Sequence, residues 1–197
     1  MLQAFDRLPA YLREVGVEAS PEQLRLFRVH YELLLRWNRK INLTAIREPA
    51  EILRRHFAES AFLTRVLRLG HGTLIDVGSG AGFPGVPIKV LSPETRVILV
   101  ESVQKKAAFL KEVVRGLGMS GLEVFADRLK ALDVRADWLT MRAVRADGEF
   151  LAEARRVVPR GTLALVLSES GAKSLGQDWR LNPIPGRSGS VVAMRST

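Results

Sequence analysis

The stretch from Asp76 to Gly85, which reads Asp-Val-Gly-Ser-Gly-Ala-Gly-Phe-Pro-Gly, constrains the fold more than any other part of the sequence. It overlaps the end of a short apolar run, 73–77, that is typical of a buried strand. Its glycines allow positive φ angles and let the backbone approach a ligand closely. A helix that follows offers free N–H groups to an anionic group. We therefore predict a strand, a ligand-binding turn and a helix in succession.

Downstream of this turn, predicted strands and helices alternate. Strands are predicted at 73–77, 96–101, 122–126, 136–141 and 162–167, and helices at 86–91, 105–117 and 147–158. A turn is predicted at 182–185 and a last edge strand at 191–194. The pattern predicts an α/β fold with a mostly parallel sheet and helices on both faces. Ligands of such sheets bind beyond the carboxyl ends of the strands.

The first 70 residues are predicted to be helical. Ser20, Pro21 and Gln23 form the pattern of a helix start, in which Ser20 is the N-cap and Gln23 completes a capping box. A second helix is predicted from Pro49 to Gly70. We expect residues 1–70 to be a helical extension packed on a core of residues 71–197, with both parts in one compact unit.

Composition limits the chemistry. The chain has no cysteine, which excludes disulfides, iron–sulfur clusters and thiol nucleophiles. Its three histidines lack metal-ligand spacing, so we expect no metal. No apolar run approaches the roughly 20 residues that span a bilayer, and no secretory signal is evident. We expect a cytoplasmic monomer without a membrane partner.

The formal net charge is +9 at pH 7, and it is spread along the chain without a basic tail. Sustained positive potential favours a polyanionic partner such as nucleic acid. The excess of arginine over lysine is also compatible with a simple effect of genome composition. Charge alone therefore suggests an RNA or DNA partner without establishing one.

Two ligands compete for the glycine turn. The dinucleotide pattern Gly-x-Gly-x-x-Gly, started at Gly78, would place a glycine where Phe83 stands. The alternative, acid-x-Gly-x-Gly-x-Gly, is the pattern of enzymes that use S-adenosylmethionine (AdoMet). Backbone N–H groups could hold the AdoMet carboxylate, and Asp76 could face its ammonium. We favour AdoMet, with a dinucleotide or a purely structural turn as the alternatives.

Two later strand ends fit the rest of that cofactor. Glu101 could accept both hydroxyls of an adenosine ribose, or it could be a solvated strand-end charge. Arg128 and Leu129 follow the third predicted strand, where an adenine ring would lie. A plain turn is equally compatible with those two residues.

Five stretches of the sequence match one known family. They are Trp37 to Thr44, Arg55 to Ser60, Asp76 to Gly85, Glu101-Ser102 before Lys105-Lys106, and Arg142-Ala143. The chain thereby resembles the bacterial methyltransferase G family of small-subunit ribosomal RNA, also called glucose-inhibited division protein B. The resemblance implies a Rossmann-like class I AdoMet-dependent methyltransferase that makes 7-methylguanosine in 16S ribosomal RNA. It implies AdoMet as cofactor, S-adenosylhomocysteine as product, and the RNA or the small-subunit particle as partner.

The resemblance also implies site residues. Cofactor contacts are expected from Asp76, Gly78, Ser79, Gly80, Gly82, Phe83, Glu101, Ser102, Arg128, Leu129 and Arg142. Arg142 is also the catalytic candidate, as a residue that positions guanine O6 or a phosphate. The alternative for Arg142 is an ordinary ion pair with Asp137 or Glu169. RNA contacts are expected from Arg39, Lys40, Asn42, Arg47, Arg55 and His56, some of which could instead be solvated or packed residues.

The chain departs from the family pattern at three positions. Glu101 stands where the family usually has Asp, and Lys130 where it more often has an acid. The lysine that usually follows the fifth strand is missing, and Lys173 is the nearest candidate. These departures concern RNA positioning more than cofactor binding.

The chemistry implied by the resemblance needs few residues. Guanine N7 carries a lone pair and no proton at neutral pH, so in-line attack on the AdoMet methyl needs no general base. Alignment of the reacting atoms then supplies most of the rate. Two alternatives stay open: a small-molecule methyltransferase on the same fold, and a nucleotide-binding module without catalysis.

Overall fold

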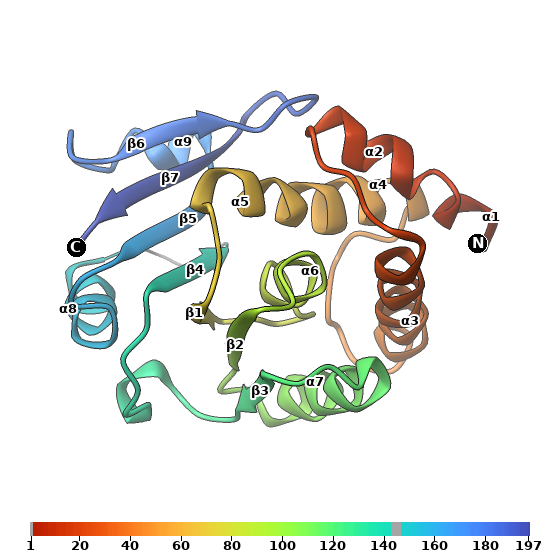
Figure 1. Ribbon diagram of the computed structural model, residues 1–197, viewed down its shortest axis with the longest axis horizontal. Coiled ribbons are helices and arrows are strands. Elements are labelled where there is room, and N and C mark those ends of the chain that lie inside the picture. Colours follow the sequence, from red (N-terminus) through yellow and green to blue (C-terminus); the bar gives the residue numbers. More distant parts are fainter. Residues whose placement is uncertain (1, 143–146) are drawn as a thin grey trace.

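The computed structural model describes residues 2–142 and 147–197 and contains a seven-stranded sheet (Figure 1). The strands are β1 (Gly72–Val77), β2 (Thr95–Val100), β3 (Leu122–Phe125), β4 (Trp138–Arg142), β5 (Thr162–Ser168), β6 (Arg180–Pro183) and β7 (Ser190–Ser196). They lie in the order β3-β2-β1-β4-β5-β7-β6. β1 to β5 are parallel, and β7 is antiparallel to both of its neighbours. The predicted fold class is confirmed.

β1 marks the point where the strand order reverses. It pairs with β2 on one side and with β4 on the other, so Val77 lies beside both Val100 and Met141. The carboxyl ends of these strands meet at one edge of the sheet. Ligands of doubly wound sheets bind at this reversal point, which is where the glycine turn begins.

Helices cover both faces of the sheet. The α-helices are α1 (Leu2–Phe5), α2 (Leu8–Glu14), α3 (Pro21–Asn38), α4 (Pro49–Ile52), α5 (Glu59–Leu67), α6 (Gly85–Leu91), α7 (Gln104–Leu117), α8 (Gly148–Val157) and α9 (Glu169–Ala172). A π-helix, η1 (Leu53–Ala58), joins α4 to α5, and a 3₁₀-helix, η2 (Leu129–Ala131), follows β3. In Figure 1, α8 lies on one side of the sheet, and α3, α5, α6 and α7 lie on the other.

The two faces of the sheet bury two separate hydrophobic clusters, because successive residues of a strand point to opposite sides. Leu74 and Leu99 belong to the larger cluster, which also holds Phe27 of α3 and Leu63 of α5. Ile75 and Ile98 belong to the cluster under α8. The N-terminal helices thus contribute to the same core as the sheet. The division at residues 70 and 71 stays a prediction.

The predicted start of α3 is confirmed. The Ser20 hydroxyl accepts a hydrogen bond from the Gln23 N–H, and the Gln23 side chain accepts one from the Ser20 N–H. The predicted end of the second helix was wrong, because α5 ends at Leu67 rather than Gly70. Arg68 caps it in the left-handed conformation (φ 48°) that usually favours glycine.

The C-terminal strands differ most from the prediction. β7 lies between β5 and β6, so it is not the edge strand. The edge strand is β6, and it includes Asn182 and Pro183 of the predicted turn. β6 has only four residues, none of them buried, so the sequence carries no apolar pattern there. Proline is tolerated because an edge strand leaves one row of N–H groups unpaired.

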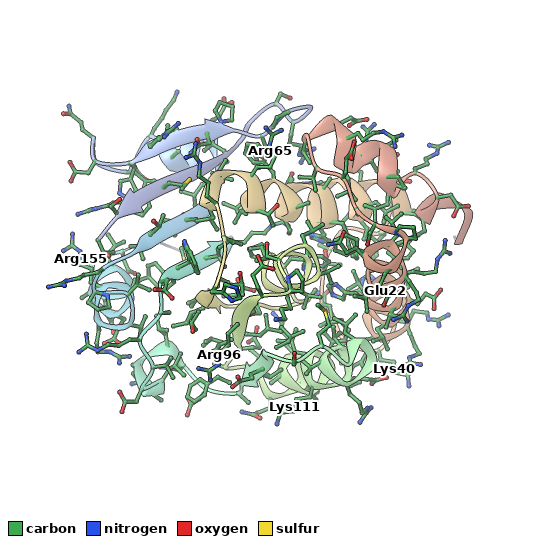
Figure 2. The ribbon with its side chains drawn as sticks, viewed as in Figure 1. Glu22, Lys40, Arg65, Arg96, Lys111 and Arg155 are labelled. Carbon is green, nitrogen blue, oxygen red and sulfur yellow. The ribbon has the colours of Figure 1, made fainter. Side chains whose placement is uncertain are left out.

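Charged side chains point outward around the whole periphery, as the labelled Lys40, Lys111 and Arg155 show (Figure 2). This agrees with the even distribution of positive charge along the sequence. Within the described ranges, every helix is too short or too polar to cross a membrane.

Candidate active site

The glycine turn follows β1 directly and rests on the end of β2. Gly78, Gly80 and Gly82 have φ angles of 68°, 55° and 87°, which side chains other than glycine rarely adopt. The N–H groups of Gly78 and Ser79 both donate to the carbonyl oxygen of Val100, at 2.9 and 3.1 Å. The turn is therefore a fixed loop with its backbone bent by glycine.

Asp76 is fully buried beneath the loop. Its Oδ2 accepts a 3.0 Å hydrogen bond from the Gly85 N–H, and its Oδ1 accepts one of 3.2 Å from the Thr140 hydroxyl. Burial raises the pKa of Asp76 to about 6, although these hydrogen bonds act in the opposite direction. The carboxylate thus ties β1 to α6 and β4. Its predicted contact with the cofactor ammonium stays a prediction.

Glu101 closes the loop from the side of β2. Its Oε2 accepts a 2.9 Å hydrogen bond from the Gly80 N–H, and its Oε1 accepts one of 2.8 Å from the Val103 N–H. Each carboxylate oxygen has two lone pairs, so each can accept a further hydrogen bond. A Cβ at Gly80 would meet only the Gly78 carbonyl oxygen, at 3.7 Å. The free lone pairs of the Glu101 carboxylate suit the ribose hydroxyls of AdoMet. The open space at Gly80 suits its amino-acid end.

The predicted adenine-side residues lie at the next strand end. Arg128 is exposed, and its N–H donates to the side chain of Asp127 at 2.6 Å. Leu129 is buried in the cluster under α8, and Ser102 is exposed beside Glu101. Leu129 thus supplies apolar surface close to the ends of β2 and β3. Lys130 lies in η2 and Lys173 caps α9; both are exposed.

Phe83 lies between the loop and the N-terminal helices. Its ring stacks with His30 and His56 at centroid distances of 4.7 and 4.8 Å. The His30 Nε2 lies 2.8 Å from the Ala81 carbonyl oxygen, which can only accept, so this nitrogen donates. Burial lowers the pKa of His30 to about 4. Burial, helped by Arg142 and Arg55, lowers that of His56 to about 2. Both rings are therefore neutral packing partners at pH 7.

Arg142, the last residue of β4, forms an ion pair with Glu59 of α5 at 3.4 Å. The alternative partners considered for Arg142, Asp137 and Glu169, are not used: the Asp137 carboxylate accepts the Thr73 N–H instead. The other carboxylate oxygen of Glu59 accepts a 2.7 Å hydrogen bond from Nε of Arg187. Arg55 joins these three residues around a cavity of about 470 Å³.

A π-helix brings Arg55, His56 and Glu59 to this place. Arg55 and His56 lie in η1, and Glu59 is the first residue after it. π-helical turns occur frequently at functional sites, because the extra residue rotates the side chains that follow. Ala143, which follows Arg142 in the motif quoted above, lies outside the described residues.

The predicted RNA-contact residues fall into two groups. Arg39 and Arg47 line a second cavity of about 440 Å³ beside Ile46 and Ile52. Lys40 and Asn42 are exposed on the same segment. Arg55 and His56 lie instead near Arg142, where His56 is buried. Their contact with RNA stays a prediction.

Sequence reasoning missed Glu59, Arg187 and Thr140 as parts of the site. Glu59 lies in the quoted stretch Arg55 to Ser60, so its proximity to Arg55 was a usable signal. Arg187 had no local signal, because it reaches Glu59 from the connection between β6 and β7. Among residues 2–142 and 147–197, no group of three or more acidic, histidine or cysteine side chains could hold a metal ion.

Comparisons with known proteins identify the family. A family described as GidB, rRNA small subunit methyltransferase G, matches residues 23–177. The chain is 38% identical over 186 residues to ribosomal RNA small subunit methyltransferase G 1 of Syntrophobacter fumaroxidans, covering 90% of this chain and 84% of the relative. It is 36% identical over 167 residues to the methyltransferase G of Geobacter sp. strain M21, covering 82% and 76%.

Solved structures show the same fold. A SAM-dependent methyltransferase from Aquifex aeolicus superposes with a TM-score of 0.56 at 19% identity, covering 75% of this chain and 93% of that chain. TYW2 of M. jannaschii, solved in complex with AdoMet, gives 0.51 at 17% identity, covering 68% and 72%. The AdoMet use that these two neighbours' names give agrees with the predicted cofactor. The chain belongs to the rRNA small subunit methyltransferase G family.

Proposed function

We propose that this chain transfers the methyl group of AdoMet to N7 of a guanine in 16S ribosomal RNA. The observation that carries the proposal is the order of side chains along one edge of the sheet. Glu101 follows β2, the glycine turn follows β1, and Arg142 ends β4. An acidic site therefore borders a cavity lined by arginines. The acidic site suits the positively charged methyl donor, AdoMet, and the arginines suit the negatively charged methyl acceptor, RNA.

When bound, AdoMet supplies an electrophilic methyl group on a positively charged sulfur. Guanine N7 has no proton to lose, so the protein needs no general base at this step. Its residues instead hold the reactants in line. Glu101, which accepts the Gly80 N–H, would also accept the ribose hydroxyls. The open space at Gly80 would take the amino-acid end. The neutral, buried His30 and His56 are consistent with this, because neither is placed to exchange a proton at pH 7.

Arg142 is the residue that we assign to the acceptor. Its guanidinium could donate to guanine O6 or to a phosphate, but it must leave N7 free. It is only 17% exposed and is held by Glu59, so its position is fixed before RNA binds. Preorganised donors of this kind lower the cost of aligning a substrate. The exposed Arg39, Lys40, Asn42 and Arg47 would contact more distant parts of the RNA.

The experiment treats 16S RNA that lacks the modification, free or in small-subunit particles, with the protein and AdoMet. Mass spectrometry of the digested RNA should detect 7-methylguanosine, and Arg142→Ala should reduce its yield at least tenfold. The free RNA and the particle are compared directly, since either could be the substrate. A methyl group on an exocyclic amine, or methylation of small metabolites alone, would contradict the proposal.

A further inference from the structure

The cavity at the ends of β4 and β5 has the charge of an anion site. It is lined by Arg55, Arg142 and Arg187 with Glu59 as the one acid, together with Val166, Leu167 and three serines, Ser168, Ser188 and Ser190. Three guanidiniums and Glu59 leave a formal charge of +2 in the lining. Glu51, whose carboxylate lies 3.8 Å from Nη1 of Arg187 at the edge of the cavity, reduces this to +1. Like charges gathered in a partly buried place repel each other. An anionic ligand would relieve that repulsion.

Two donors of the arginines that line the cavity lack an acceptor. Nη1 of Arg142 and Nε of Arg55 are both buried, and neither has a hydrogen-bond partner within the described part of the chain. Buried N–H groups are satisfied in the great majority of cases, so an unsatisfied pair indicates a missing acceptor. An oxyanion can accept from both guanidiniums, because arginine presents several donors in one plane.

Glu59 fixes the arrangement. It is 5% exposed, accepts from Nε of Arg187 at 2.7 Å and lies 3.4 Å from Nη2 of Arg142. The Glu59 carboxylate thus orients two guanidiniums, that of Arg142 at the end of β4 and that of Arg187 in the connection between β6 and β7. It uses only part of their donors, which leaves the remaining N–H groups for a ligand. Arg187 is 27% exposed, so it can be reached from outside.

We propose that Arg55, Arg142 and Arg187 form a phosphate-binding site for the RNA backbone, with Glu59 as the positioning residue. This inference rests on the proposed function and deepens it. The site lies at the ends of β4 and β5, whereas the glycine turn and Glu101 lie at the ends of β1 and β2. A phosphate held by Arg187 would lie in the same cavity as Arg142. Specificity for the reacting nucleotide would then begin with its backbone.

The test measures binding of a short single-stranded RNA that spans the target guanine, at several salt concentrations. Arg187→Ala should weaken binding about tenfold or more. It should also make the slope of log K against log salt concentration about 0.7 less negative, because one phosphate contact is lost. AdoMet affinity should stay unchanged, and KM for RNA should rise more than kcat falls. Arg160→Ala is the matched control, since Arg160 is exposed near the opposite ends of the strands.

A second variant separates ligand binding from structure. If Arg187 served only to neutralise Glu59, the double variant Glu59→Gln, Arg187→Ala would recover RNA binding. If Arg187 contacts phosphate, binding stays weak in the double variant. Recovery would therefore overturn the proposal, as would an effect of Arg187→Ala no larger than that of Arg160→Ala.

The RNA can be changed instead of the protein, which avoids any folding defect. A single neutral methylphosphonate near the target guanine should weaken binding to the unaltered protein about tenfold at one position. The Arg187→Ala variant should be insensitive to that same substitution. Equal losses in both proteins at every position would refute the site. Failure to form 7-methylguanosine would refute the proposed function alone, because the binding readouts do not depend on it.

Discussion

The carboxylate of Asp76 accepts a 3.0 Å hydrogen bond from the backbone N–H of Gly85, nine residues further along the chain. The acid at the start of the glycine motif thus holds the far end of that motif in place. Its second oxygen accepts from the Thr140 hydroxyl on β4, so one side chain connects β1, α6 and β4. The shape of the cofactor loop therefore depends on a residue buried beneath it.

The first prediction concerns Gly85, which packs directly against Asp76. A Cβ there would lie 2.4 Å from Leu99 Cδ2 and 2.7 Å from Asp76 Oδ2. Gly85→Ala should therefore lower the free energy of unfolding by about 1–3 kcal/mol, as overpacking does in other cores. Urea unfolding measures this. The control is Gly148→Ala, where a Cβ meets nothing within 4 Å; equal stability of the two variants would contradict the packing.

Replacement of Asp76 should change how stability depends on pH. Its pKa is raised to about 6 in the folded protein, whereas an unfolded aspartate titrates near 3.9. The folded state holds this proton more tightly, so the contribution of Asp76 to stability decreases as pH rises from about 4 to about 6. Asp76→Asn removes this loss, because an amide does not ionise. The amide can still accept from the Gly85 N–H and donate to the Thr140 hydroxyl, so the local structure is kept.

The difference in free energy of unfolding between Asp76→Asn and the unaltered protein should therefore increase with pH over that window, by at most about 3 kcal/mol. Chemical unfolding at pH 4.5, 5.5 and 6.5 measures it. Asp133→Asn makes the same change of charge at an exposed position and serves as control. A constant difference for Asp76→Asn across the three pH values would show that the buried carboxyl keeps an ordinary pKa.

The parallel part of the fold could be predicted because its signals are local. Apolar runs bounded by glycine and proline located β1, β2 and β5 to within two residues, and Gly118 (φ 61°) ends α7 as expected. The amphipathic pattern of α7 predicts Ala108, Phe109, Val113 and Leu117 on the buried face. The prediction for Ala108 was wrong, because Ala107 is buried and Ala108 is exposed. Helical periodicity gives the direction of a buried face only to within about one residue, because neighbouring residues are about 100° apart.

The site was predictable where one segment supplies it and not where distant segments meet. The glycine turn and Glu101 follow their strands directly, so strand prediction alone brought them together. The contact between Glu59 and Arg187 joins residues 128 positions apart and depends on the β6–β7 pairing. No pattern in either segment specifies that pairing, because β6 carries no buried residue. Such contacts are decided by tertiary packing.

The buried His30 should lower the free energy of unfolding of the protein at acidic pH. Burial lowers its folded pKa to about 4, whereas an unfolded histidine titrates near 6.5. The unfolded chain therefore binds a proton that the folded chain excludes, and stability is lost as pH falls from about 6.5 toward 4. This is opposite in sign to the effect of Asp76.

The variant His30→Gln should reduce that acid-induced loss by up to about 3 kcal/mol at pH 4. Glutamine keeps an N–H donor for the Ala81 carbonyl oxygen, so the variant retains a partner for that group. Unfolding curves at pH 7 and pH 4.5 provide the comparison. His71→Gln, at an exposed position, is the control. The interpretation fails if both variants lose stability in acid to the same extent as the unaltered protein.

Glu101 provides the direct test of where the cofactor lies. Glu101→Gln should weaken AdoMet binding about tenfold or more, because an amide cannot accept ribose hydroxyls at both of its ends. Glu101→Asp should bind better than Glu101→Gln, since it keeps the charge. Isothermal titration calorimetry measures all three affinities. Glu94→Gln makes the same charge change at an exposed position before β2 and should leave the affinity as it is. Unchanged AdoMet binding in Glu101→Gln would mean that the ribose lies at another strand end, and the assignment of the acidic cofactor site would have to be abandoned.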